Sequence, residues 1–202
     1  MFGDAPMSSA VPGGPPRMAL VYTALCSLDG YVVDADGSFD WAQPSPEVHR
    51  AVNAIERRAS TIVLGRRTYE VLTVWDDPAA VFGELPPEIA EYAEVWAGID
   101  KVVVSSTLAE VSTARTRLVR TLAADDVRDL VASARGDVSI GGPTTAAPFL
   151  RAGLVEAIDL FVSPVVVGGG TRALPDGARL DLTLTRTHAF ADGTVHLAYA
   201  RR

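Results

Sequence analysis

The segment "DVSIGGPTTAAPFL", residues 137–150, joins a short apolar strand to a pair of glycines and then to a helix that begins with proline. Proline is favoured at the first helical position, because its missing N–H would have no partner there. Gly141 and Gly142 carry no side chain, so a ligand can approach the free amides where this helix begins. We predict that a dinucleotide phosphate lies beside the two glycines, and an ordinary tight turn is the alternative.

Apolar, strand-like runs alternate with segments of helical periodicity along most of the chain. Strands are predicted over residues 18–25, 60–65, 101–106, 137–142 and 158–168, and helices over residues 45–59, 86–98, 122–135 and 143–153. Pro148 is expected to end or kink the last helix. Asp192 and Gly193, between two alternating runs, predict a hairpin near the C-terminus. The pattern therefore predicts an α/β domain with a central mixed, mostly parallel sheet flanked by helices.

Composition limits the kinds of partner. The 202 residues are 48% hydrophobic, enough for one core, and the net charge of -7 argues against nucleic acid. No apolar run has the roughly 20 residues of a membrane span, so we expect a cytoplasmic protein and no membrane partner. Residues 1–17 are rich in Pro, Gly and Ser and are predicted to be a flexible arm before a domain over 18–202. Cys26 is the only cysteine, which excludes an internal disulfide.

Two further junctions between a strand and a following segment carry candidate ligand-binding groups. Gly65 ends a buried strand, and Arg66 and Thr68 open a short helix whose free amides and guanidinium suit a phosphate. Ser105 and Ser106 end another strand and can donate to a ribose or its phosphate. The alternatives are a surface turn with solvated arginines and a capping or turn role for the serines.

Other ligand sites are poorly supported. "GGGTRA" (168–173) matches a dinucleotide-binding pattern, but "LPDG" follows at once and excludes the required helix. "DADGSFD" (34–40) lacks the remaining ligands of a calcium loop and is predicted to be a polar turn. His188 and His196 lie on opposite arms of the predicted hairpin, where cross-strand packing is favoured over shared zinc binding. We therefore expect no metal site.

The junctions occur in the order "GRRTYE", "VVVSS" and "IGGPTTAAPFL", and "SLDGYV" (27–32) precedes them. From Met18 to the C-terminus the chain resembles the dihydrofolate reductase-like superfamily. Within it, the chain is most similar to the reductase domain of riboflavin biosynthesis, the C-terminal domain of the bifunctional deaminase-reductases. "AIDLFVSPVVVGGG" (157–170) is similar to the strand and glycine loop that follow in this family.

The resemblance implies a dihydrofolate reductase-like fold and NADPH as the cofactor. It places the cofactor's phosphates at Gly65, Arg66 and Thr68, its adenosine ribose at Ser105 and Ser106, and its pyrophosphate at Gly141, Gly142 and Thr144. In the family a cis peptide bond joins the two glycines, so a cis bond is expected here. Many relatives carry an arginine for the 2'-phosphate near the position that Ser106 occupies, and the choice between NADPH and NADH stays open.

Reduction of a carbonyl or imine carbon leaves charge on the neighbouring heteroatom, so a nearby acid assists the reaction. A carboxyl group buried beside the nicotinamide would have a raised pKa, and Asp29 and Asp40 are the candidates, with turn or capping roles as the alternative. Trp41, Tyr69 and Trp75 offer flat faces for a heterocycle, with core packing as the alternative.

The function expected from this resemblance is an NADPH-dependent reductase acting on a small pyrimidine-ribosyl or pterin-like substrate. The most specific expectation is 5-amino-6-(5-phosphoribosylamino)uracil reductase. A noncatalytic dinucleotide-binding or interaction domain on the same fold is the alternative. A homodimer is a further possibility, since relatives often pair through sheet edges.

Overall fold

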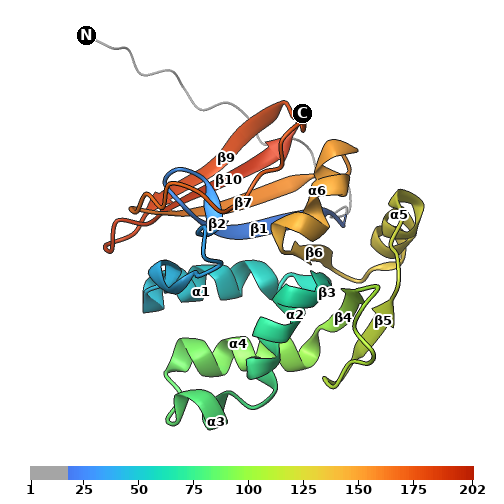
Figure 1. Cartoon of the computed structure of the whole chain (residues 1–202), viewed down its shortest axis with the longest axis horizontal. Helices are drawn as coiled ribbons and strands as arrows, with labels where there is room; N and C mark the ends of the chain where they lie inside the picture. The colour runs from blue at the N-terminus through green and yellow to red at the C-terminus, as the bar shows by residue number, and fades with distance from the viewer. Residues whose placement is uncertain (1–17) are drawn as a thin grey trace.

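The computed structural model describes residues 18–202, and the predicted arm over residues 1–17 lies outside the described residues. An eight-stranded sheet runs through the centre of the molecule (Figure 1) in the order β5-β4-β3-β6-β1-β7-β10-β9. These strands are β1 (Leu20–Ser27), β3 (Ala59–Gly65), β4 (Asp100–Val104), β5 (Thr116–Val119), β6 (Asp137–Gly141), β7 (Ala157–Ser163), β9 (Leu182–Ala189) and β10 (Val195–Arg201). Two short strands, β2 (Tyr31–Val33) and β8 (Thr171–Arg172), pair separately.

Helices connect most of the strands. They are α1 (Pro46–Glu56), α2 (Arg66–Leu72), α3 (Pro78–Phe82), α4 (Pro87–Gly98), α5 (Ala124–Ser133) and α6 (Pro143–Arg151), with single-turn helices η1 (Asp40–Ala42) and η2 (Thr73–Asp76). The six strands from β5 to β7 are parallel to their neighbours, and β10 is antiparallel to both β7 and β9. The predicted mixed, mostly parallel sheet with a closing hairpin is therefore confirmed.

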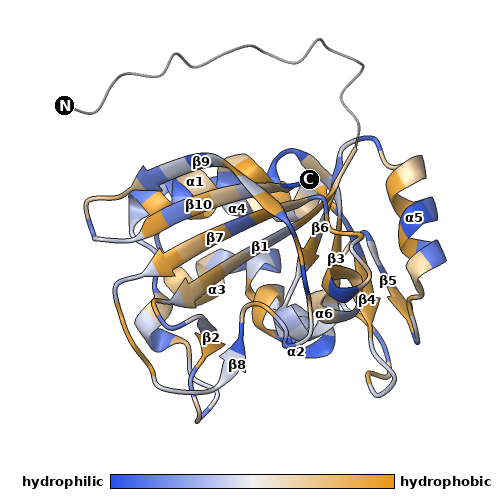
Figure 2. Ribbon diagram, turned by 90° about the horizontal axis from the view of Figure 1, so that it is seen from above, coloured by the Kyte–Doolittle hydropathy of each residue, from blue (hydrophilic) through white to orange (hydrophobic). Residues whose placement is uncertain are grey.

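Alternating side chains of the central strands form two cores, one on each face of the sheet. Tyr22, Val63 and Ile140 face one side and pack with residues of α5 and α6, including Val127 and Phe149. On the other side, Leu64 and Val103 pack with Tyr69 and Trp96, which belong to α2 and α4, and Val48 of α1 packs with Phe161. Figure 2 shows the hydrophobic colouring concentrated along the central strands and the strongest hydrophilic colouring on exposed turns of the helices, as in α5.

The helix predicted over residues 143–153 continues past Pro148 to Arg151. The expectation that Pro148 ends the helix is therefore wrong. Ala146, Phe149 and Leu150 recur at helical spacing and are buried against the sheet, while Pro148 is exposed. Burial of this face keeps the last turn helical although Pro148 donates no backbone hydrogen bond. Strands β2, β5 and β8 and helix α3 were not predicted, since none exceeds five residues.

None of the helices between residues 18 and 202 has the length and apolar content of a membrane span. The segment "GGGTRA" leads into the two-residue strand β8, so the helix that a dinucleotide-binding motif requires does not follow it. Gly170 has a φ of +125°, and a Cβ atom there would lie 2.0 Å from the Val33 carbonyl oxygen. The glycine is therefore required where β8 approaches β2.

Candidate functional site

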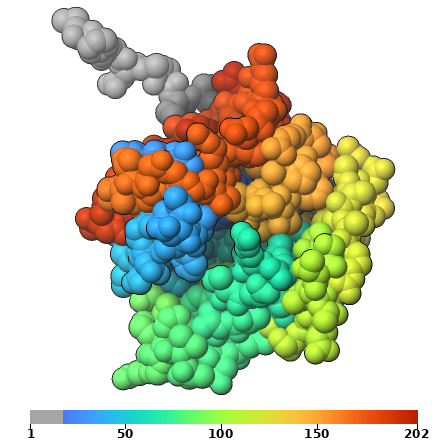
Figure 3. All heavy atoms as spheres, in the orientation of Figure 1, coloured from blue at the N-terminus to red at the C-terminus, as the bar shows by residue number. Residues whose placement is uncertain are grey.

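The three predicted junctions lie at one edge of the sheet. Leu64 of β3 is opposite Gly141 of β6, and on the other side Gly65 is opposite Val104 of β4. Parallel strands end at the same edge, about 4.8 Å from their neighbours. The turns after β6, β3 and β4 are therefore adjacent, in that order. In Figure 3, α2 and α6 lie near each other on one face of the molecule, and the surface is hollowed beside them.

The glycines of the first two junctions contact protein atoms. A Cβ atom on Gly142 would lie 2.4 Å from Thr68 Oγ1, and one on Gly141 would lie 2.8 Å from Leu64 Cδ2. Reciprocally, a Cβ atom on Gly65 would lie 2.3 Å from Thr145 Oγ1. The prediction that a dinucleotide phosphate explains the absence of side chains at the glycine pair is corrected here, because Thr68 and Leu64 already fill that space.

The peptide bond between Gly141 and Gly142 is trans, since residues 18–202 contain no cis peptide bond. The expected cis bond is therefore wrong for this chain. Gly142 has a φ of +87°, a conformation that glycine adopts without steric cost, and it turns the chain from β6 into α6 with a trans bond.

Two helices begin at this edge without a side-chain cap. The N-cap residues are Gly65 for α2 and Gly142 for α6, so the first amides of both helices receive no side-chain acceptor. Arg66 is exposed and lies 3.8 Å from Glu70, an ion pair of little net energy. Thr144 is exposed beside these amides. Free amides together with a weakly held guanidinium fit the diphosphate of NADPH.

The two serines after β4 have different environments. Ser105 is buried, and its hydroxyl oxygen accepts hydrogen bonds from the amides of Thr107 (3.2 Å) and Leu108 (3.0 Å). Its hydroxyl therefore stabilises the turn, which was the alternative interpretation, and the expected ribose contact by this side chain is corrected. Ser106 is exposed and stays a candidate for the adenosine end.

Asp29 fixes a turn instead of donating a proton. Its carboxylate accepts hydrogen bonds from the Ser27 hydroxyl (2.7 Å) and from the amides of Val167 (3.2 Å) and Gly168 (2.8 Å). The Ser27 hydrogen bond and these two amides lower the pKa of Asp29. A lowered pKa is the reverse of what a proton donor needs, so the predicted catalytic role of Asp29 is corrected to a structural one.

Asp40 and Trp41 lie in η1, between β2 and α1. Asp40 is exposed, so the expectation of a buried carboxyl group is wrong at this position. The indole Nε1 of Trp41 is buried and has no hydrogen-bond partner among the described residues. A buried donor without a partner is costly, and Trp41 stays a candidate substrate residue.

Tyr69 is part of the core, with 3% of its surface exposed. Its hydroxyl accepts hydrogen bonds from the amides of Ser112 (2.9 Å) and Thr113 (3.2 Å). The predicted contact of Tyr69 with a substrate is therefore corrected to a packing role. Trp75 is half-buried, with its ring centroid 5.8 Å from those of His49 and Phe82.

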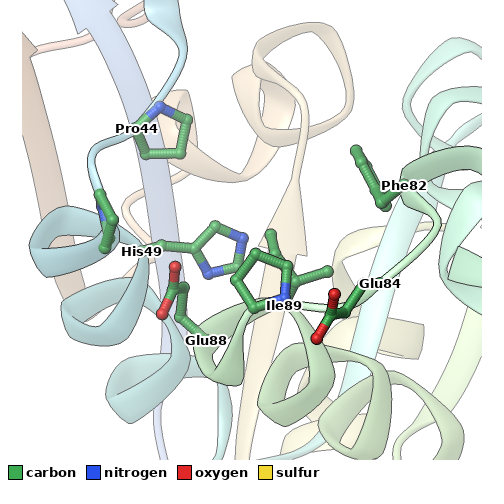
Figure 4. A pocket seen from close by; sticks show the side chains of 8 residues that line it. Pro44, His49, Phe82, Glu84, Glu88 and Ile89 are labelled. Carbon is green, nitrogen blue, oxygen red and sulfur yellow. The ribbon is translucent and has the colours of Figure 1, made fainter. Parts of the chain in front are cut away.

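A cavity of about 290 Å³ lies between the beginnings of α1 and α4 (Figure 4). It is lined by Pro44, Pro46, His49, Phe82, Glu84, Pro86, Glu88 and Ile89. Helix α1 follows the strands β1 and β2, and α4 leads into the amino end of β4, so both helices begin on the side where the parallel strands end. The cavity therefore opens near the strand-end turns. These residues were missed because "SPEVHR" and "ELPPEI" carry no chemical motif.

His49 gives this cavity a hydrogen-bond acceptor. The Asn53 amide nitrogen donates to the Glu88 carbonyl oxygen (2.9 Å) and to the Glu91 carboxylate (2.7 Å), so the amide oxygen of Asn53 must accept from His49 Nδ1 (3.0 Å). Burial lowers the pKa of His49, which favours the neutral ring. In the neutral ring that donates from Nδ1, the lone pair is on Nε2. With Glu84 and Glu88, the cavity presents acceptors and two carboxylates.

His196 and His188 are directly opposite each other on β10 and β9, as predicted. His196 Nε2 lies 2.7 Å from the Asp159 carboxylate, and its ring stacks on Phe161. Within residues 18–202 no group of three or more His, Cys, Asp or Glu side chains is arranged to hold a metal ion.

The sequence profile of the RibD C-terminal domain matches residues 19–197. The chain belongs to this family. It is 34% identical over 155 residues to the riboflavin biosynthesis protein RibD of Mycobacterium tuberculosis, a match that covers 74% of the chain and 43% of that relative. The RibD C-terminal domain described here therefore spans less than half of that relative's length. It is also 24% identical over 181 residues to the uncharacterized protein YyaP of Bacillus subtilis, covering 86% of the chain and 89% of YyaP.

Solved structures place this RibD C-terminal domain in the dihydrofolate reductase-like fold. A putative riboflavin biosynthesis protein from Shewanella sp. PV-4 is similar with a TM-score of 0.72 and 24% identity, covering 92% of the chain and 99% of that structure. The dihydrofolate reductase of Enterococcus faecalis, solved in complex with NADP(H), has a TM-score of 0.59 and 12% identity, covering 92% of the chain and 98% of that structure.

Proposed function

We propose that this RibD C-terminal domain is an NADPH-dependent reductase that transfers a hydride to a pyrimidine-ribosyl or pterin-like substrate. The most specific activity that we propose is that of a 5-amino-6-(5-phosphoribosylamino)uracil reductase. The observation that carries the proposal is the adjacency of two uncapped helix starts, at Gly65 and Gly142, with Arg66 beside them. Free amides at two adjacent helix starts, with an arginine as the first residue of one helix, are suited to a dinucleotide diphosphate.

NADPH, when bound, supplies the hydride. The chain's own groups bind and orient the reactants. The amides at the beginnings of α2 and α6 and the Arg66 guanidinium hold the diphosphate, and Thr68 and Thr145 keep the two helix starts at a fixed separation. Asp29 fixes the exit turn of β1 against the amides of Val167 and Gly168. Asp40 stays the proposed proton donor.

The cavity beside His49 is the proposed site for the substrate ring. Phe82 and the prolines provide apolar contact, and His49, Glu84 and Glu88 provide acceptors for amino groups. Arg50 pairs with Glu88 at 3.3 Å. No lysine or arginine is among the residues that line the cavity, and a phosphate group there would meet the Glu84 carboxylate. The cavity therefore favours an amino-substituted ring over a phosphate group.

Replacement of Arg66 by Gln tests the diphosphate site. A charge-assisted hydrogen bond contributes about 1.5–3 kcal/mol, so we expect NADPH to bind roughly 10- to 100-fold more weakly. Fluorescence titration with NADPH measures the affinity. Arg128→Gln is the matched control, because Arg128 is an exposed helical arginine in a similar ion pair on α5. Equal affinities for Arg66→Gln and the unmodified chain would contradict the proposed diphosphate site.

Turnover distinguishes the reductase from a noncatalytic binding domain. The absorbance of reduced nicotinamide is followed after addition of pyrimidine-ribosyl or pterin-like acceptors. Oxidation of NADPH is expected with one of these classes. Binding of NADPH without oxidation by any acceptor would favour the noncatalytic alternative, and absence of binding to NADPH and NADH would exclude both.

A homodimer is also proposed. Strand β9 is one edge of the main sheet, and most of its residues are exposed. An unpaired edge of eight residues can accept a strand from a second copy. Sedimentation velocity is expected to give the mass of a dimer, and Arg186→Pro, in the middle of the exposed strand β9, should shift the distribution to monomer.

A further inference from the structure

Asn53 of α1 is fully buried and holds the ring of His49. Its amide nitrogen donates hydrogen bonds to the Glu88 carbonyl oxygen (2.9 Å) and to the Glu91 carboxylate (2.7 Å). Both partners only accept, so the amide oxygen of Asn53 must be the atom that lies 3.0 Å from His49 Nδ1. An amide oxygen cannot donate, so Nδ1 carries the proton of the neutral ring.

Arg57 extends this series of hydrogen bonds to the surface. Its guanidinium donates to Oε1 of Glu91, while Asn53 donates to Oε2 of the same carboxylate. These hydrogen bonds, first that from Asn53 and then that from Arg57, lower the pKa of Glu91, so the carboxylate stays ionised and can only accept. The direction of every hydrogen bond between Arg57 and His49 is therefore fixed.

Aromatic side chains restrict the orientation of the His49 ring. The rings of Trp75 and Tyr92 are both edge-on to it, with centroids 5.8 Å from the centroid of the imidazole. Nε2 has no hydrogen-bond partner in the described part of the chain, and it is not closed off from solvent. In Figure 4 the ring extends away from α1, into the space between Pro44 and Phe82. The cavity therefore receives a lone pair of fixed direction.

The position of the proton on His49 determines which substituent of a bound ring this nitrogen can contact. A lone pair on Nε2 accepts a hydrogen bond from an amino group, whereas a methyl or carbonyl group in the same place leaves it without a donor. We propose that Asn53 is a positioning residue of the substrate site, which holds His49 Nε2 as the acceptor for an exocyclic amino group of the substrate ring. This inference rests on the proposed function, because it needs a substrate ring in the cavity.

The tautomer of His49 is measured first, without any ligand. Heteronuclear NMR of the histidine rings is recorded at about pH 8, above the pKa of an ordinary histidine. The chain has three histidines, and His49→Phe identifies the signals of this ring by their loss. We expect a protonated Nδ1 and an unprotonated Nε2, and in Asn53→Leu the proton should also occupy Nε2. A proton on Nε2 of the unmodified chain would overturn the inference.

Matched ligands that differ in one amino group then test the acceptor. Calorimetric titrations compare 5-aminouracil with 5-methyluracil and 6-aminouracil with 6-methyluracil. In at least one pair, the amino form is expected to bind the unmodified chain roughly 10-fold more tightly. His49→Phe and Asn53→Leu should remove this preference and change the affinity for the methyl form by less than about threefold. Glu94→Gln is the control and should keep the preference, because Glu94 is an exposed residue of α4.

The outcomes separate a positioning role from a structural one. If Asn53→Leu weakens both members of a pair equally, Asn53 only joins α1 to α4 and the inference is overturned. A preference for the amino form that survives in His49→Phe would also overturn it, and this variant leaves Asn53 in place. Absence of binding by all four uracils would refute the proposed function together with this inference, whereas the wrong tautomer refutes this inference alone.

Discussion

At the scale of the residue, the local structure at the glycine pair was predicted correctly, but the reason for the missing side chains was not. The spacing of "IGGP" correctly indicated a strand followed at once by a helix. The atoms that exclude a side chain, however, belong to Thr68 and Leu64, more than 70 residues earlier in the chain. Asp29 is a similar case, because its partners at Val167 and Gly168 are distant in sequence.

Gly142→Ala tests this packing. The φ of +87° disfavours alanine, and its Cβ would lie 2.4 Å from Thr68 Oγ1, so we expect the free energy of unfolding to fall by about 1–3 kcal/mol or more. The second substitution Thr68→Ala should restore the part of the lost free energy of unfolding that is due to the clash. Gly98→Ala is the control, because no atom lies within 4 Å of the added Cβ. Urea denaturation measures all four proteins, and equal stabilities of Gly142→Ala and Gly98→Ala would disprove the packing argument.

At the scale of the element, α6 shows that burial can outweigh the preference of a single residue. Pro148 lacks the N–H that would donate to the carbonyl oxygen of Thr144, yet the helix extends to Arg151. Ala146, Phe149 and Leu150 are buried on one face of the helix, at exposures of 0%, 4% and 0%. Burial of one large apolar side chain contributes about 1.5–3 kcal/mol, comparable with the cost of a proline within a helix.

Replacement of each of the two prolines of α6 by alanine is expected to change the free energy of unfolding in opposite directions. Pro148→Ala restores a backbone hydrogen bond at an exposed position, but it also makes the unfolded chain less rigid, which offsets part of the gain. We therefore expect the free energy of unfolding to rise by about 1–2 kcal/mol. Pro143→Ala restores no helical bond, because Pro143 is the first residue of the helix, and a loss of up to about 1 kcal/mol is expected. Thermal unfolding followed by circular dichroism gives both changes, and a Pro148→Ala variant less stable than Pro143→Ala would contradict this account.

At the scale of the whole molecule, a buried polar group links α1 to the central strands. Glu56 of α1 accepts a hydrogen bond from the Ser139 hydroxyl of β6 at 3.1 Å, and its Oε2 has no partner among the described residues. The Asp159 carboxylate, which pairs with His196, lies close enough to act on Glu56. Burial, with a smaller contribution from Asp159, raises the pKa of Glu56 from 4.5 to about 7.

This raised pKa makes stability depend on pH. A carboxyl group whose pKa is higher in the folded than in the unfolded state stabilises the fold below pH 4.5, and the contribution is lost as the pH rises through about 7. Glu56→Gln has no charge to bury, so the variant should gain up to about 3 kcal/mol relative to the unmodified chain between pH 5 and pH 8. Chemical denaturation at several pH values measures this difference. Glu110→Gln, an exposed control, should show no such trend, and parallel pH profiles for Glu56→Gln and the unmodified chain would exclude the proposed linkage.

The sequence by itself determined the alternation of strands and helices, the hairpin at Asp192 and Gly193, and the positions of the turns that contain Ser106 and follow Gly65 and Gly141. These features depend on periodicity, caps and turns, which are properties of neighbouring residues. Only the tertiary structure decided that Thr68 and Thr145 lie against the glycines, and that the amides of Val167 and Gly168 bind Asp29. Such contacts join segments that are adjacent only because parallel strands end at one edge of the sheet, and no local pattern specifies which side chains meet there.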